Sequence, residues 1–155
     1  MIEVRPFTTS DSEEASNIIV RCLREVNRNE YTEGQIERLC NAFSPVKLNQ
    51  RFSGRKSFVA VMNESIVGTA TIKHNELGSV FVDPDFHRQG VGRILMDFIE
   101  SLARRDGITL LKANSSLSAV NFYQQLGYEI LGERCEPDGE ITIKIEKQLT
   151  PLLSG

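Results

Sequence analysis

The chain has 155 residues, of which 40% are apolar and 25% charged, and its formal net charge is −3. These values are typical of one globular domain, residues 1–155, whose core needs no disulfide or metal to stabilise it. They exclude a general polyanion binder, and no run of about 18 apolar residues exists to span a membrane. Three widely spaced cysteines and an N-terminus without a signal-peptide pattern lead us to expect a cytoplasmic protein with free thiols.

The first half of the chain predicts a strand, two helices and three further strands. Apolar residues recur at helical spacing in both helices, and Thr32 with Gln35 has the form of a capping box. Pro45 is expected to end the second helix, and the polar, basic stretch from there to Lys56 is interpreted as a loop. The first two of the three strands flank a short turn, Asn63-Glu64-Ser65, and are predicted to form a hairpin. The expected elements are a strand at 2–7, helices at 15–26 and 32–43, and strands at 58–62, 66–72 and 76–82.

The second half predicts a long helix with a wide apolar stripe that includes Ile94, followed by a buried strand, a short helix and a hairpin. Cys22 and Cys40 lie on apolar helix faces and are interpreted as core residues, whereas Cys135 falls in a predicted turn without a role. A meander that feeds a strand–helix–strand crossover indicates an α/β (α+β) fold, with a mixed sheet and helices on both faces. The elements are expected at 91–105, 109–113, 117–126, 128–131 and 140–147.

Residues 80–96, VFVDPDFHRQGVGRILM, place two glycines one residue apart where the long helix begins. A helix start leaves about four N–H groups without partners and carries about half a positive charge, so it can hold an anion. Bare backbone at Gly90 and Gly92 would let phosphate oxygens approach closely. Easier helix entry explains one glycine but explains two poorly, because glycine weakens a helix by about 1 kcal/mol relative to alanine. Further donors would come from His87, Arg88, Gln89 and Arg93.

The two common nucleotide-binding motifs fit this segment poorly. A Walker loop needs four residues between its glycines and then Gly-Lys-Ser/Thr, and no such string occurs. The dinucleotide fingerprint needs a third glycine, where this chain has Leu95, and a tight turn where residues 83–89 intervene. A regulatory nucleotide binder is therefore a disfavoured interpretation.

The segment VFVDPDFHRQGVGRILM resembles the acetyl-CoA-binding motif of the GNAT superfamily of N-acetyltransferases. Residues 114–130, NSSLSAVNFYQQLGYEI, resemble the motif that follows it in that family. The resemblance extends over essentially the whole chain. It implies a mostly antiparallel central sheet of about seven strands, flanked by four helices on both faces. One departure is visible, because the family usually begins its phosphate step with Gln or Arg and this chain has His87.

The resemblance implies acetyl-CoA as co-substrate and no metal. The pyrophosphate would lie on the amides of residues 88–93, and the pantetheine arm would lie alongside residues 80–82, since a strand edge can bond an extended amide chain. Asn121 resembles a position that contacts the cofactor, and Asn114 is a second candidate. The expected cofactor-binding residues are Val80, Phe81, Val82, His87, Arg88, Gln89, Gly90, Val91, Gly92, Arg93, Asn114, Asn121 and Tyr123.

An N-acetyltransferase must take a proton from its amine. Freeing the lone pair of a lysine-like ammonium, whose pKa is near 10.4, costs about 4 to 5 kcal/mol at neutral pH. The resemblance, aligned on the two glycines, puts Glu76 where some family members carry a catalytic glutamate. It would need burial or a bridging water to act as a base, and a solvated residue at a strand start explains Glu76 as well. His74 is the alternative base, because its ordinary pKa is nearer neutrality.

The leaving thiolate needs a proton in return. Tyr123 resembles the general acid of the family, and a phenol with a pKa near 10 can protonate a thiolate. Core packing is the alternative explanation, because Phe122, Tyr123 and Leu126 fit one helix turn, although Phe122 could fill the core instead. The oxyanion would need a strand amide near Phe81 or Val82.

The predicted function is transfer of an acetyl group to a primary amine, on a small molecule or as a lysine or N-terminal amine. The alternative is a non-catalytic acyl-CoA-binding sensor. A polyamine-like or lysine-like acceptor would suit acidic residues on the first two helices, although an amphipathic helix carries such charges without any substrate. No nucleic-acid or membrane partner is expected, and a sheet edge is available for a homodimer. The acidic residues are Glu25, Glu30, Glu33 and Glu37.

Overall fold

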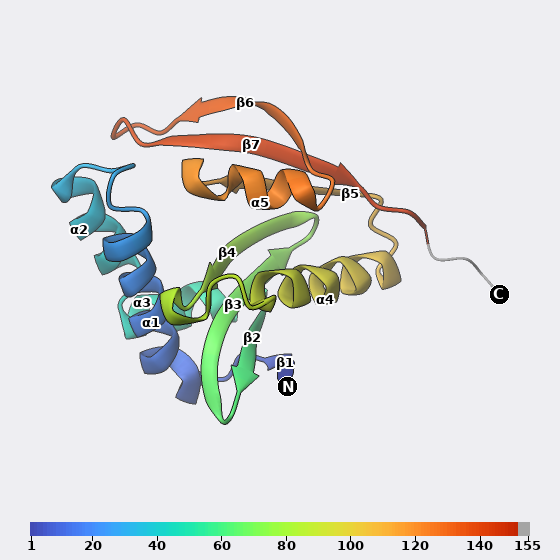
Figure 1. Cartoon of the computed structure of the whole chain (residues 1–155), viewed down its shortest axis with the longest axis horizontal. Coiled ribbons are helices and arrows are strands. Elements are labelled where there is room, and N and C mark those ends of the chain that lie inside the picture. Colours follow the sequence, from blue (N-terminus) through green and yellow to red (C-terminus); the bar gives the residue numbers. More distant parts are fainter. Residues whose placement is uncertain (152–155) are drawn as a thin grey trace.

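One seven-stranded sheet organises the computed structural model, which describes residues 1–151. Neighbouring strands are antiparallel except for one parallel pair, the fourth and fifth in chain order. The strands are β1 (Ile2–Pro6), β2 (Lys56–Met62), β3 (Ser65–Lys73), β4 (Glu76–Val82), β5 (Leu110–Ser115), β6 (Glu129–Cys135) and β7 (Ile141–Gln148). Their order across the sheet is β1-β2-β3-β4-β5-β7-β6, so the predicted mixed, mostly antiparallel sheet is confirmed (Figure 1).

Residues 1–151 form five α-helices around the sheet, one more than expected. They are α1 (Ser12–Arg21), which continues into a π-helical turn (Cys22–Val26), α2 (Glu33–Ala42), α3 (Pro45–Ser53), α4 (Val91–Arg105) and α5 (Val120–Gln125). Short 3₁₀ turns occupy Thr9–Asp11, Pro84–Phe86 and Leu117–Ala119. Among residues 1–151, no helix is long and apolar enough to cross a bilayer.

The prediction of a loop between Pro45 and Lys56 is wrong, because this stretch holds α3. The Ser44 hydroxyl accepts a bond from the Lys47 N–H at 3.4 Å, and Pro45 occupies the first turn, where a proline needs no N–H. Pro45 therefore ends one helix and begins the next. Only two side chains of α3, those of Leu48 and Phe52, are buried. Two are too few to give a clear helical period of apolar residues in the sequence.

The helices cover both faces of the sheet, as predicted. The first core lies under α4 and contains Leu95, Met96 and Ile99 together with residues of the strands. The second lies under α1, α2 and α3, which Figure 1 shows gathered on one side of the molecule. Ile94 was expected in the apolar stripe of α4, but it is exposed. These two layers place α4 and α3 on opposite sides of β4.

Several local predictions are confirmed and two are corrected. Thr32 and Gln35 form the reciprocal capping box, with N···O distances of 3.0 and 3.1 Å. Cys22 and Cys40 are buried. Cys135, by contrast, ends β6 rather than lying in a turn, and β5 alternates in burial rather than being buried throughout.

The strands β4 and β5 diverge at the centre of the sheet. Within the described residues they pair only at Glu76 and Lys112. On its other side, β4 carries a bulge in which Ser79 has a φ of 49°, and its register with β3 shifts between Thr69 and Thr71. Beyond Glu76 the edge of β4 that faces β5 is therefore left without a strand partner.

Candidate functional site

A cavity of about 930 Å³ is lined by β4 and β5 beyond the point where they pair. The first turn of α4, the loop before it, and α5 line it as well. Residues around α1, α2 and α3 complete its wall. A smaller hollow of about 600 Å³, between the end of β1 and α3, contains none of the predicted site residues.

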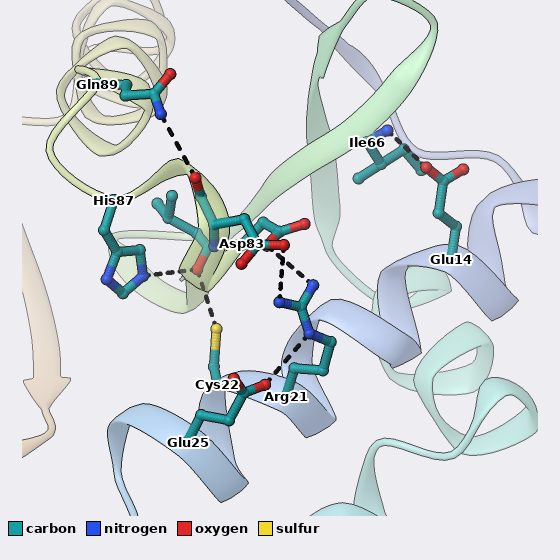
Figure 2. Close-up of polar contacts among 10 residues, drawn as sticks. Glu14, Arg21, Cys22, Glu25, Ile66, Asp83, His87 and Gln89 are labelled. Carbon is teal, nitrogen blue, oxygen red and sulfur yellow. Dashed lines mark hydrogen bonds and ion pairs between the residues drawn. The ribbon is translucent and has the colours of Figure 1, made fainter.

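The cavity brings together all but two of the predicted site residues. Gln89 and Asn121 do not line it. The amide of Gln89 lies 3.4 Å from the carbonyl oxygen of Asp85 (Figure 2), and Asn121 is exposed on α5. The predicted residues in the wall are Glu76, Val80, Phe81, Val82, His87, Arg88, Gly90, Val91, Gly92, Arg93, Asn114 and Tyr123.

Glycine is favoured at the two positions of the helix start for different structural reasons. Gly90 caps α4 with a φ of 85°, a left-handed conformation that favours glycine, and a Cβ there would meet nothing within 4 Å. A Cβ on Gly92 would lie 3.0 Å from Cζ of Phe122, closer than ordinary contact. Packing of α4 against α5 therefore favours glycine at position 92.

The first turn of α4 nevertheless offers free donors. The first helical bond runs from the Ile94 N–H to the Gly90 carbonyl at 3.0 Å. Among residues 1–151, the N–H groups of Val91, Gly92 and Arg93 meet no acceptor, and all three residues line the cavity. This turn can therefore bind an anion.

An ionic network ties the loop after β4 to α1 (Figure 2). Arg21 lies 3.0 Å from Asp83, 3.2 Å from Asp85 and 3.3 Å from Glu25. The Asp83 carboxylate is nearly buried and also accepts a bond from the Asp85 N–H at 2.9 Å. These contacts hold the loop from which α4 begins.

The carbonyl of Val82 accepts from two side chains (Figure 2). His87 Nε2 lies 2.9 Å from this oxygen, and the Cys22 thiol donates to it at 3.0 Å. His87 is thus tethered to the end of β4 while it lines the cavity. Burial raises the pKa of Cys22 to about 12, so it remains a thiol at neutral pH and does not act as a nucleophile.

The two candidate bases lie in different places. Glu76 is exposed at the start of β4 and lines the cavity, and its backbone carbonyl accepts a bond from Arg55 at 2.8 Å. His74 is exposed in the turn between β3 and β4 and does not line the cavity. The geometry therefore favours Glu76.

Tyr123 belongs to the core and to the cavity wall at once. Its ring packs edge-on against Phe122 and Tyr128, with centroids 5.1 and 5.4 Å apart, and only 6% of the residue is exposed. Within the described residues its hydroxyl has no hydrogen-bond partner, and burial raises its pKa well above the ordinary value. The phenol is thus protonated at neutral pH and available as a donor.

Residues 27–149 match the family model of the acetyltransferase (GNAT) domain. The chain belongs to the GNAT acetyltransferase family. The GCN5-related N-acetyltransferase of Rhodopseudomonas palustris has a similar structure, with a TM-score of 0.88 and 26% identity over 95% of each chain. The PaiA N-acetyltransferase of Thermoplasma acidophilum, solved in complex with coenzyme A, has a TM-score of 0.81 and 17% identity, over 96% of this chain and 99% of its own.

The peptidyl-lysine N-acetyltransferase YjaB of Salmonella typhimurium is 32% identical over 72 residues. That match covers 46% of this GNAT chain and 48% of YjaB. The chain thus spans about half the length of the curated relatives it matches.

The acidic residues expected to attract an acceptor do not line the cavity of this GNAT protein. Glu25 pairs with Arg21, Glu37 with Arg24, and Glu30 accepts from Asn27 and Ser118. The cavity is lined there instead by residues in or next to α2, α3 and β7, which come from segments too far apart for the sequence to have joined them. They include Tyr31, Phe43, Arg51, Arg55, Glu140 and Thr142.

Proposed function

We propose that this GNAT protein transfers the acetyl group of acetyl-CoA to a primary amine by direct attack. The observation that carries the proposal is the cavity between β4 and β5. It joins the free amides of the first turn of α4 to the side chains of Glu76 and Tyr123. The presence of coenzyme A in the PaiA structure, which shares the fold, supports the choice of cofactor.

The residues present fit coenzyme A. The N–H groups of Val91, Gly92 and Arg93 would hold the pyrophosphate, with the Arg88 and Arg93 side chains adding charge. The unpaired edge of β4, residues 80–82, would bond the pantetheine amides as a strand would. Asn114, on β5, lines the opposite wall.

Acetyl-CoA supplies a thioester whose carbonyl accepts the amine and whose sulfur leaves. Glu76, directly or through a water, takes the proton from the ammonium and frees its lone pair. An N–H of Phe81 or Val82 donates to the oxyanion that develops as the C–N bond forms. Tyr123 would then donate its proton to the thiolate as the C–S bond breaks, and the second proton that the adduct nitrogen loses would restore the Tyr123 phenol. The products are the acetylated amine and the free thiol.

The exposure of Glu76 favours one alternative, a non-catalytic acyl-CoA sensor. Among residues 1–151, no side chain bonds its carboxylate or fixes it toward a substrate. Such a protein would bind acetyl-CoA and release no thiol with any amine.

The Tyr123→Phe variant tests the mechanism through thiol release from acetyl-CoA with a panel of amines. We expect an unchanged acetyl-CoA affinity and a turnover lower by roughly 10²-fold or more. Tyr128→Phe is the matched control, because it removes a hydroxyl from the same core. That hydroxyl donates to Glu100 at 2.9 Å, and Tyr128 does not line the cavity. Equal turnover in the wild type and Tyr123→Phe at saturating cofactor would remove Tyr123 from the mechanism.

A further inference from the structure

We infer that the acceptor is a zwitterion, an amine that also carries a carboxylate, and that Arg51 and Arg55 bind this carboxylate. The inference rests on the proposed acetyl transfer and names its substrate class. Both arginines line the cavity, one in the last turn of α3 and the other just before β2. We call Arg51 and Arg55 together the arginine pair.

The arginine pair lies on the opposite side of the sheet from the first turn of α4. Val80 and Val82 pack against the core under α4, whereas Phe81 between them packs against the core under α1, α2 and α3. The cavity contacts all three residues and therefore reaches both faces. An acceptor bound beside the arginine pair would thus meet the β4–β5 gap from the side that the cofactor does not occupy.

Arg51 is oriented without being neutralised. Its Cζ lies 4.7 Å from the centre of the Phe43 ring, which in turn packs edge-on against Phe81 at 5.6 Å. Among residues 1–151, no carboxylate forms an ion pair with its guanidinium. The planar fork of donors is therefore available for a bidentate contact with a carboxylate.

Arg55 is fixed more firmly. It donates to the Thr71 hydroxyl and to the Glu76 carbonyl, both at 2.8 Å. A Cβ at Gly78 would lie 3.0 Å from its Nη2, so the glycine leaves room for it. Within residues 1–151, the remaining N–H groups of this half-buried guanidinium have no hydrogen-bond partner. The side chain lies beside Glu76, the residue that we propose as the base.

The charges of the wall favour a zwitterion over other amines. Glu76 and Glu140 line the same cavity as the arginine pair, so these four groups sum to no net charge, while Arg88 and Arg93 of that cavity are assigned to the cofactor pyrophosphate. A polyamine would place excess positive charge beside two guanidinium groups, and a phosphate dianion would place excess negative charge beside two carboxylates. The ammonium and carboxylate of a zwitterion match both signs.

The test compares α-amino acids with their carboxamides, which keep the amine and lose the negative charge. Thiol release from acetyl-CoA is measured for the wild type, Arg51→Gln and Lys47→Gln. Lys47 lies on the same helix, is exposed and does not line the cavity, so its substitution is a matched control. We expect the wild type and Lys47→Gln to prefer the amino acids by roughly 10- to 100-fold in kcat/KM. Arg51→Gln should lose that preference, because its kcat/KM falls far more for the amino acids than for the carboxamides.

The outcomes separate this inference from the proposed function. Three results would overturn the inference while the proposed acetyltransferase function is kept. They are acetylation without a preference for the carboxylate, a preference that survives Arg51→Gln, and faster transfer to phosphoethanolamine than to amino acids. If no amine is acetylated, the proposed function fails, and calorimetric binding of N-acetyl amino acids in the presence of coenzyme A decides the inference. Binding that Arg51→Gln abolishes supports the carboxylate site, and binding equal to that of the carboxamides overturns it.

Discussion

Replacement of Gly92 by alanine separates packing from ligand approach at the start of α4. The added Cβ would lie 3.0 and 3.1 Å from Cζ and Cε1 of Phe122, where ordinary carbon contacts are about 3.5 to 4.0 Å. Overpacking of this kind destabilises by about 1 to 3 kcal/mol. The helix propensity of alanine returns up to about 1 kcal/mol. We therefore expect Gly92→Ala to lower the free energy of unfolding by about 0 to 2 kcal/mol.

The double variant Gly92→Ala/Phe122→Leu isolates the packing contribution. Leucine lacks the two ring atoms that the new Cβ would meet. In that background Gly92→Ala should be neutral or stabilising by up to about 1 kcal/mol. The coupling free energy between the two substitutions should therefore be about 1 to 3 kcal/mol. Chemical denaturation of the four proteins of this cycle measures it.

Gly90→Ala is the matched control, because a Cβ there has open space but must adopt a φ of 85°. It should lose roughly 1 to 2 kcal/mol from backbone strain alone, whether residue 122 is Phe or Leu. Coupling below about 0.5 kcal/mol between Gly92→Ala and Phe122→Leu would refute the packing explanation. Acetyl-CoA affinity, measured by calorimetry, gives the second result. If the affinity for acetyl-CoA falls and stays low in the double variant, glycine is needed at position 92 for approach of the ligand rather than for packing.

Two further predictions concern titratable side chains. Cys22, with a pKa of about 12, is ionised in roughly one molecule in ten thousand at pH 8. Iodoacetamide should therefore alkylate the exposed Cys135 and spare Cys22. Similar alkylation rates of the two cysteines, measured by peptide mass spectrometry, would contradict the burial of Cys22. The Arg5 guanidinium lies 2.8 and 2.9 Å from the Asp11 carboxylate oxygens and, together with the Thr8 N–H, holds the pKa of Asp11 below its usual range. This contact therefore stabilises the fold at pH values above the unfolded pKa, which is near 3.9. The stabilisation is lost as the pH falls through the lower folded pKa. Asp11→Asn should thus destabilise by about 1 to 2 kcal/mol at pH 7, since Arg5 is partly exposed and screened, and by much less at acidic pH; urea unfolding that gives the same difference at pH 7 and pH 3 would refute this.

The sequence by itself predicted the elements whose signals are local. The capping box of Thr32 and Gln35 marked the start of α2, and hydrophobic periodicity marked α4. The Asn63-Glu64 turn marked the first hairpin, and both of these residues have the positive φ that such a turn requires. The same local analysis missed α3, although Ser44 followed by Pro45 is a helix-start signal. It failed there because Pro45 also ends α2 and because only Leu48 and Phe52 are buried.

The tertiary structure decided the site. The motif around Gly90 and the motif around Tyr123 pointed to its cofactor side, because each is a continuous stretch of chain. The divergence of β4 and β5 left no mark in the sequence, since strand pairing depends on contacts between distant residues. The same holds for Arg51, which reaches the cavity only because α3 packs on the face of the sheet opposite α4. Local patterns report backbone conformation and burial, whereas the acceptor side of this cavity is formed by side chains that only the packing of separate elements brings together.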